Sequence, residues 1–191
     1  LHFDVVNDGT DRHARERHRV ARLHIGLGSR DHLVANAQAL PKDSIDPTKV
    51  LAHFSSETID ATMTTVTGNH LARVDEAGHV YVSAFAASGL QFSVHFHQCT
   101  EADGQTQCAA LQLLTSWEVE EGTAGVDQLL ANAVPNNLFV NMGLAPDGRP
   151  YMTRIVIAGQ GISQANLASE IEIFLQTAER FSADLNSLDA S

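Results

Sequence analysis

The sequence predicts an α+β fold in which helices pack on one face of a single antiparallel β-sheet. Short strand patterns follow one another with only tight turns between them, which favours hairpins. Helical patterns lie at both ends of the folded part and once in its middle, and the last of them is long and amphipathic. The expected order is therefore α-β-β-β-β-α-β-β-α. A chain of 191 residues is long enough for one such domain and too short for two domains with a linker.

The first 39 residues differ in composition from the rest. Residues 1–39 hold six of the 12 Lys and Arg residues and five acidic residues, whereas residues 40–191 hold six basic and 18 acidic residues. We expect residues 1–39 to be a disordered leader or a non-native extension, because so polar a segment buries too little apolar surface to offset its ordering entropy. Residues 40–191 then form a single α+β domain.

A candidate cleavage site separates these two parts. Ala37-Gln38-Ala39 has the small-residue form of a signal-peptidase site, which predicts cleavage after Ala39. No apolar run of the usual ~7 to 15 residues precedes it. We expect a periplasmic or secreted protein, with the cytoplasm as the alternative.

A short helix over about residues 47–57 is expected to open the folded part. Asp46 is a suitable N-cap, and Pro47 fits the first helical position because its missing N–H needs no partner there. The helix would bury three apolar residues, Val50, Leu51 and Phe54. The β-branched residues of 61–67 favour extended structure.

Four strands are expected next. The first three cover residues 71–74, 80–86 and 90–97, with turn-forming clusters between them, and the fourth covers residues 109–119. Apolar and polar residues alternate through 90–97, which is typical of a strand with one buried face.

A second helix over about residues 124–134 would begin at a Thr123 cap and stop at Pro135. Strands over 138–144 and 151–157 would flank a turn at Pro146-Asp147-Gly148, where glycine tolerates the positive φ that the turn needs.

The longest helix is expected to follow Ser163, its N-cap. Its apolar residues recur with helical spacing for about six turns. They are Leu167, Ile171, Phe174, Leu175, Ala178, Phe181, Leu185 and Leu188.

Charge and hydropathy exclude two classes of partner. The net charge of −11 repels phosphate backbones, so we expect no nucleic-acid binding. No stretch reaches the ~18 to 20 uninterrupted apolar residues of a membrane helix, so we expect no membrane insertion.

The two cysteines are the most specific local signal. Cys99 and Cys108 bracket a polar, glycine-containing loop between two strands, so a loop that folds back brings them close enough to form a disulfide. An oxidising compartment would favour this bridge. Two reduced thiols in a cytosolic hairpin are the alternative.

Metal binding is a further alternative for this region. His95, His97 and Cys99 lie two residues apart on a strand and would share a face, and Cys108 could add a fourth zinc ligand. A disulfide would remove both thiolates, so we expect no metal and no cofactor.

Catalytic templates are absent from the sequence: we find no G-x-S-x-G, G-x-x-x-x-G-K, H-E-x-x-H or C-x-x-C. Gly159-Gln160-Gly161 resembles part of a phosphate loop, but a plain strand-to-helix turn explains it. Glu118, Glu120 and Glu121 are interpreted as an acidic strand edge that discourages aggregation. We therefore expect no catalytic residues and no enzymatic activity.

The order of these motifs resembles the YbjN family of bacterial proteins. The run Gly89–Cys99, the second cysteine at Cys108, the hairpin at 146–151 and the step Gly161-Ile162-Ser163 carry the resemblance, which covers about residues 47–185. Family members often have Asn-x-x-Asn near the end of the middle helix, whereas here Asn132 is followed by Pro135.

This resemblance implies a fold similar to type III secretion chaperones, a role in sensory transduction or stress regulation, and no established catalytic activity. Members with a leader are exported. We therefore expect a non-enzymatic, exported binding or regulatory module that contacts a protein partner. One alternative is a small metal- or redox-active enzyme that uses His95, His97, Cys99 and Cys108. A second alternative is a homodimer that resembles a secretion chaperone.

Overall fold

The computed structural model describes residues 45–102, 104–119 and 123–189. All of them belong to one compact unit, Asn36–Ser191. The predictions for residues 1–39, including cleavage after Ala39, lie outside the described residues. In chain order the elements are β1 (Val50–Leu51), α1 (Ser56–Val66), β2 (Asn69–Val74), β3 (Val80–Phe85), β4 (Gln91–Ala102), β5 (Gln105–Ser116), α2 (Val126–Asn136), β6 (Asn141–Leu144), β7 (Pro150–Ile157), β8 (Ile162–Ser163) and α3 (Gln164–Asp189).

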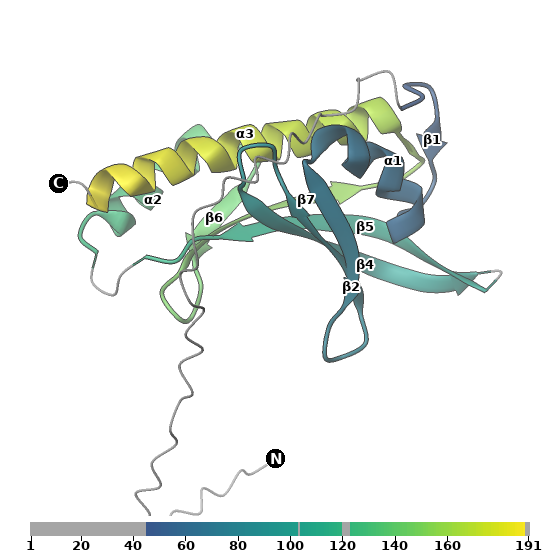
Figure 1. Ribbon diagram of the computed structural model, residues 1–191, viewed down its shortest axis with the longest axis horizontal. Helices are drawn as coiled ribbons and strands as arrows, with labels where there is room; N and C mark the ends of the chain where they lie inside the picture. Colours follow the sequence, from purple (N-terminus) through teal and green to yellow (C-terminus); the bar gives the residue numbers. More distant parts are fainter. Residues whose placement is uncertain (1–44, 103, 120–122, 190–191) are drawn as a thin grey trace, which may run out of the picture. The chain divides into compact units, whose positions relative to one another are not determined.

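The main layer is a six-stranded sheet with the strand order β2-β3-β4-β5-β7-β6. Every pair of neighbouring strands is antiparallel. Figure 1 shows α1, α2 and α3 on the same side of this sheet, with α3 running across it. The α+β class with an antiparallel sheet is confirmed.

The prediction of a single sheet is wrong, because β1 and β8 form a second, two-stranded sheet. Val50 pairs with Ser163 and Leu51 with Ile162. The Gly161 backbone, at φ 113°, passes so close to Val50 that an added Cβ would lie 2.4 Å from Cγ1 of that valine. Strands of two residues are too short to show an alternating pattern, so the order expected from the sequence contains neither β1 nor β8.

The first helix is also displaced from its predicted position. Ser55, not Asp46, is the N-cap, and a capping box joins it to Thr58 in both directions: the Thr58 amide donates to Ser55 Oγ at 3.2 Å, and the Ser55 amide donates to Thr58 Oγ1 at 2.8 Å. Asp46 instead closes a local turn by accepting from the Thr48 amide at 2.9 Å.

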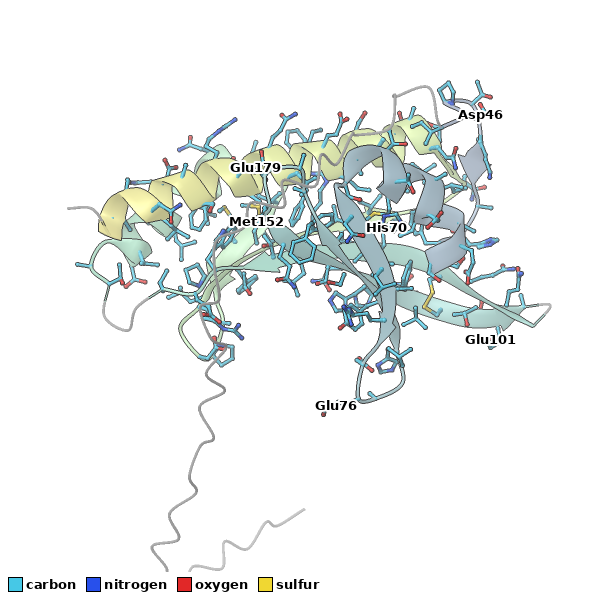
Figure 2. The ribbon with its side chains drawn as sticks, viewed as in Figure 1. Asp46, His70, Glu76, Glu101, Met152 and Glu179 are labelled. Atoms are coloured by element: carbon cyan, nitrogen blue, oxygen red, sulfur yellow. A yellow bond between two sulfur atoms is a disulfide. The ribbon has the colours of Figure 1, made fainter. Side chains whose placement is uncertain are left out.

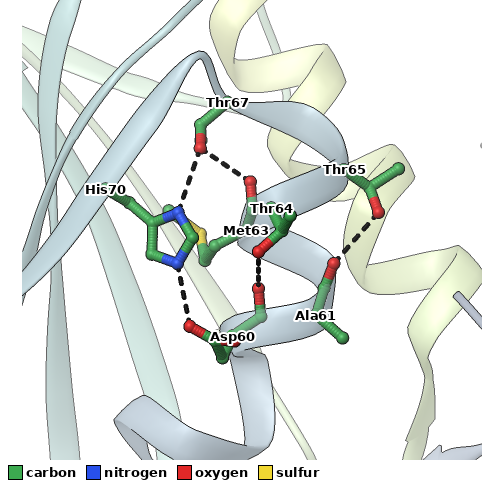
Figure 3. A network of polar contacts seen from close by, with 7 residues as sticks. All are labelled: Asp60, Ala61, Met63, Thr64, Thr65, Thr67 and His70. Atoms are coloured by element: carbon green, nitrogen blue, oxygen red, sulfur yellow. Dashed lines mark hydrogen bonds and ion pairs between the residues drawn. The ribbon is translucent and has the colours of Figure 1, made fainter. Parts of the chain in front are cut away.

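Threonines that favoured extended structure lie inside α1. Thr64 Oγ1 donates to the Asp60 carbonyl at 2.9 Å, and Thr65 Oγ1 donates to the Ala61 carbonyl at 3.0 Å (Figure 3). These bonds within the helix satisfy hydroxyls that would otherwise favour non-helical structure. Residues 61–66 therefore continue the helix that begins at the Ser55 cap, despite their preference for strands.

The predicted hairpins are confirmed, and the β4–β5 hairpin is longer than expected. The two strands remain paired as far as Ala102 and Gln105 and turn through Gly104, which has φ 74°. The segment between the cysteines is thus mostly strand, not loop. It was missed because polar residues occupy both of its faces, so it shows no alternation.

The helix α2 begins and ends slightly later than predicted. Its N-cap is Gly125, at φ 94°, instead of Thr123, and Pro135 lies within its last turn. A proline there removes only one helical hydrogen bond. The cap of α3 is confirmed, since Ser163 Oγ accepts from the Asn166 amide at 3.2 Å.

The core lies between α3 and the large sheet. Figure 2 places Met152 of β7 between these layers, and its side chain is fully buried. The rings of Phe92 on β4 and Phe174 on α3 are 6.1 Å apart, and those of Trp117 and Phe181 are 4.9 Å apart. The predicted apolar face of α3 therefore covers the sheet.

Candidate functional site

The structure brings the two predicted cysteines together. Cys99 and Cys108 are direct partners across β4 and β5, and their sulfur atoms lie 2.10 Å apart, at the distance of a disulfide. Cys108 is buried, and its backbone also exchanges two hydrogen bonds with Phe54, at 2.8 and 2.9 Å. The bridge therefore joins β4 to β5, and the backbone of Cys108 joins this part of the hairpin to the segment before α1.

The two histidines of the metal hypothesis have other partners. His95 Nε2 lies 2.8 Å from Ser93 Oγ, and the His95 ring stacks on Tyr81 with 5.4 Å between centroids. Burial of His95, and secondarily the neighbouring His97, lowers the pKa of His95 below its ordinary value. His97 Nε2 lies 3.0 Å from Oε1 of Gln112.

The four residues of the metal alternative do not form a ligand cluster in the part of the chain that the structure describes. Within the described parts of the chain, no three His, Cys, Asp or Glu side chains gather closely enough to hold a metal ion. With Cys99 and Cys108 at bonding distance, neither sulfur is available as a thiolate ligand.

A carboxylate, an imidazole and a hydroxyl lie in line between α1 and β2 (Figure 3). Asp60 Oδ1 is 3.0 Å from His70 Nε2, and His70 Nδ1 is 3.4 Å from Thr67 Oγ1. This order occurs in nucleophilic hydrolases, where the hydroxyl attacks a substrate. Here Thr67 is buried and donates its proton to the Met63 carbonyl at 2.7 Å, so the network fixes the end of α1.

The weaker sequence candidates have structural explanations where they are described. The Gly161 amide donates to the Ala158 carbonyl at 2.7 Å, so Gly159–Gly161 is a turn between β7 and β8. Glu118 is exposed just after β5, and the other two acids of that predicted edge, Glu120 and Glu121, lie outside the described residues.

The most exposed apolar residues lie in the short connection between α2 and β6. Leu138 is 84% exposed and Phe139 is 70% exposed, whereas the next residue, Val140, is buried. The Val140 amide donates to the Asn137 carbonyl at 3.2 Å and closes a turn around the two exposed residues. Two adjacent large side chains are therefore directed outward on a four-residue turn.

A buried arginine holds this turn in place. Arg154 on β7 donates from Nη1 to the Phe139 carbonyl at 2.5 Å, and its guanidinium carbon lies 5.6 Å from the centroid of the Phe139 ring. Arg154 is itself fixed by Glu170 on α3, which accepts from Nε at 2.5 Å and also from Nη2. Phe139 is therefore exposed to solvent and yet anchored through its backbone and its ring.

A shallow cleft of about 270 Å³ between α2 and α3 lies beside this turn. Leu129 and Phe181 supply apolar surface, and amide and charged groups supply the polar surface. The lining residues are Leu129, Asn132, Ala133, Asn136, Asn137, Thr177, Arg180, Phe181 and Asp184. We call Leu138, Phe139 and this cleft together the α2–β6 site.

Sequence reasoning missed the α2–β6 site. It assigned Leu138 and Phe139 to a strand over 138–144, whereas β6 begins at Asn141. An apolar pair after Pro135 is compatible with a buried strand and with an exposed turn, and periodicity does not separate the two. Arg154 gave no signal, because its partner Glu170 lies on another element.

Comparisons with protein families, with curated proteins and with solved structures found no match to this chain. Within the described residues, no helix combines the length and the apolar character needed to cross a membrane.

Proposed function

We propose that this chain is a non-enzymatic, exported binding or regulatory module of the YbjN type that contacts a protein partner through the α2–β6 site. One observation carries the proposal: Leu138 and Phe139 are the two most exposed large apolar side chains of the described residues, and the buried Arg154, paired with Glu170, holds their turn. The role that the resemblance to the YbjN family implies is sensory transduction or stress regulation.

A fixed apolar turn lowers the free-energy cost of binding. Large apolar side chains that enter a partner's pocket supply most of the binding energy at many protein interfaces. A turn that is already fixed loses little conformational entropy when it binds, so more of that energy remains as affinity. Arg154 fixes this turn, because it binds the Phe139 carbonyl and lies over the Phe139 ring.

The ion pair between the buried Arg154 and the half-buried Glu170 supports the same interpretation. Taking Arg154 and Glu170 out of water costs desolvation energy, and a well-packed apolar pair is often at least as stable. This ion pair also positions Phe139, which gives it a use beyond stability. The disulfide-distance cysteines are compatible with the proposed export.

Affinity capture from a Gram-negative periplasmic extract tests the proposal. The wild-type chain should retain a defined protein partner, and Phe139→Ser should lose it because the anchor is removed. Val74→Ser is the matched control, since Val74 is 64% exposed and lies on β2, in a different element.

Each variant should first show a cooperative melt near the wild-type temperature. Capture that is equal for wild type and Phe139→Ser would contradict the α2–β6 site. Thiol–disulfide turnover by the purified chain would instead favour the redox enzyme built on Cys99 and Cys108.

A further inference from the structure

The cleft between α2 and α3 has an apolar floor and polar walls. Figure 1 shows α2 next to the C-terminal half of α3, and both helices supply residues to this cleft of about 270 Å³. Leu129, Ala133 and the buried Phe181 supply the floor. The Phe181 ring also packs against Trp117, with 4.9 Å between the ring centroids, which fixes this part of the floor.

Two opposite charges line the cleft from α3. Arg180 and Asp184 lie four residues apart on the helix, so their Cβ atoms are ~5 to 6 Å apart and their side chains can reach one another. Within the described parts of the chain neither of them forms an ion pair, whereas Arg149 and Arg154 are each paired with a carboxylate. A guanidinium and a carboxylate are therefore both available to a ligand in the cleft.

The asparagines of the opposite wall add hydrogen-bond acceptors. Asn136 Nδ2 donates to the Asn132 carbonyl, and Asn137 Nδ2 donates to the Ala133 carbonyl, each at 2.7 Å. These bonds orient both amides, because they commit the nitrogen atoms to the helix backbone. The Oδ1 atoms of the two amides have no partner among the described residues, so they can accept from a ligand.

Together these groups match one class of small molecule. The guanidinium can bind an anion, and the carboxylate with the two amide oxygens can bind a cation. An anion is repelled by the net charge of −11, and a cation leaves Arg180 without a partner. A zwitterion is neutral and uses both charges of the cleft. An α-amino acid carries its carboxylate and its ammonium group on one carbon, and its side chain can then cover the apolar floor.

We propose that this cleft binds a free α-amino acid with an apolar side chain. The parallel N–H groups of Arg180 bind the carboxylate of the ligand. Asp184 and the free amide oxygens of the two asparagines accept from the ammonium group. The side chain of the ligand lies against Leu129 and Ala133, where it is removed from water.

The size of the cleft limits the ligand. Pockets for drug-sized molecules have volumes of ~300 to 1,000 Å³. A cleft of about 270 Å³ therefore suits a smaller ligand, such as a single amino acid. Because Arg180 and Asp184 are exposed to water, their charges are partly screened, and we expect weak binding with a dissociation constant of about 1 mM.

The inference deepens the proposed function, and only its link to the protein partner rests on that function. Asn137 lines the cleft, and its carbonyl accepts from the Val140 amide that closes the turn around Leu138 and Phe139. A bound amino acid therefore touches the residue from which the turn begins. Phe139 is not among the residues that line the cleft, so Phe139→Ser should lose the protein partner and keep the amino acid.

NMR titration of the isotope-labelled full chain with L-leucine, and separately with L-valine, tests the binding. Saturable shifts are expected at the backbone amides of the cleft, including those of Ala133, Asn137 and Arg180. L-Leucinamide lacks the carboxylate and isocaproate lacks the ammonium group, so each should bind at least about 10-fold more weakly than L-leucine. Glycine should also bind more weakly, because it leaves the apolar floor uncovered.

Three variants locate the ligand. Arg180→Gln and Asp184→Asn should each weaken L-leucine binding about 10-fold, because each removes a charged hydrogen-bond partner. Ala133→Leu should abolish the binding without a change of charge, because the larger side chain fills the floor. Arg73→Gln is the matched control, since Arg73 is an exposed arginine on β2, which supplies no residue to the cleft. Melting curves check that all four variants fold.

The absence of saturable shifts with both L-leucine and L-valine at tens of millimolar would overturn the proposal. Equal affinities for L-leucine, L-leucinamide and isocaproate would also overturn it, because the charged groups would then play no part. An equal loss of binding in Arg180→Gln and Arg73→Gln would place the ligand elsewhere and overturn it as well. L-Leucine binding without capture of a protein partner would contradict the proposed function alone, and capture without L-leucine binding would contradict this inference alone.

Discussion

Arg154 on β7 and Glu170 on α3 form an ion pair between the sheet and the helix that covers it, with Nε of the arginine 2.5 Å from the carboxylate. The arginine side chain is 10% exposed and the glutamate side chain 31% exposed. The same guanidinium binds the carbonyl of Phe139. One side chain therefore joins a strand, a helix and the turn that we propose as the contact site.

Removing Arg154 should destabilise the fold. Arg154→Met leaves the half-buried Glu170 carboxylate without its cation and the Phe139 carbonyl without its donor, which should cost about 3 kcal/mol. Urea unfolding measures this loss. The double variant Arg154→Met/Glu170→Gln should recover at least ~1 kcal/mol of it. Losses that simply add would show that the two side chains do not stabilise each other.

The apolar face of α3 should be essential for stability. Phe174 is fully buried against the sheet, so Phe174→Ala should cost ~3 to 5 kcal/mol. Ile173 precedes it on the exposed side of the helix, and Ile173→Ala should cost less than ~1 kcal/mol. Denaturant midpoints give both values. Equal effects at the two positions would mean that the inward face of α3 has been assigned wrongly.

His95 should make stability depend on pH. Its burial and the neighbouring His97 lower its pKa in the folded state below the ordinary value of 6.5, so the unfolded chain takes up the proton first. The contribution of His95 to stability is therefore fully present above about pH 6.5, and it is lost as the pH falls toward the lowered pKa of the folded state.

The variant His95→Gln removes this titrating group and should flatten that part of the profile. Melting temperatures measured between pH 5 and pH 8 make the comparison. A profile of the variant with the same slope as the wild type would assign the pH dependence to other groups.

Cys99 and Cys108 should be oxidised in the protein isolated from its native compartment. Intact mass should rise by two hydrogens on reduction, and alkylation without reductant should leave both cysteines unmodified. Reduction should lower stability by ~2.5 to 3 kcal/mol in the chain-entropy account of a loop of about ten residues. Two freely alkylated thiols would contradict the bridge and restore the reduced alternative.

The sequence predicted those elements whose patterns are long and regular. The alternation of Phe92 and Val94 with polar neighbours identified β4, and the sustained helical spacing around Phe174 identified α3. The pairing of Cys99 with Cys108 could be predicted because the chain has only two cysteines. In each case the deciding information is local or unique.

The features that were not predicted depend on competition between helix caps or on contacts between residues that are distant in the sequence. Asp46 and Ser55 both begin plausible helices, and only the Ser55 cap has a reciprocal partner, Thr58. The position of Phe139 depends on Arg154, 15 residues away on β7. No local pattern encodes that contact, so the α2–β6 site could not be predicted from the sequence.

Photo-crosslinking in living bacteria tests the central claim, contact with a protein partner through the α2–β6 site, most directly. The photoreactive amino acid p-benzoylphenylalanine is placed at Phe139 in one sample and at Val74 in the other. The account predicts that irradiation yields one defined covalent adduct with a different protein of the cell from position 139 and none from position 74. An absence of adduct at position 139, or the same adduct from both positions, would contradict it.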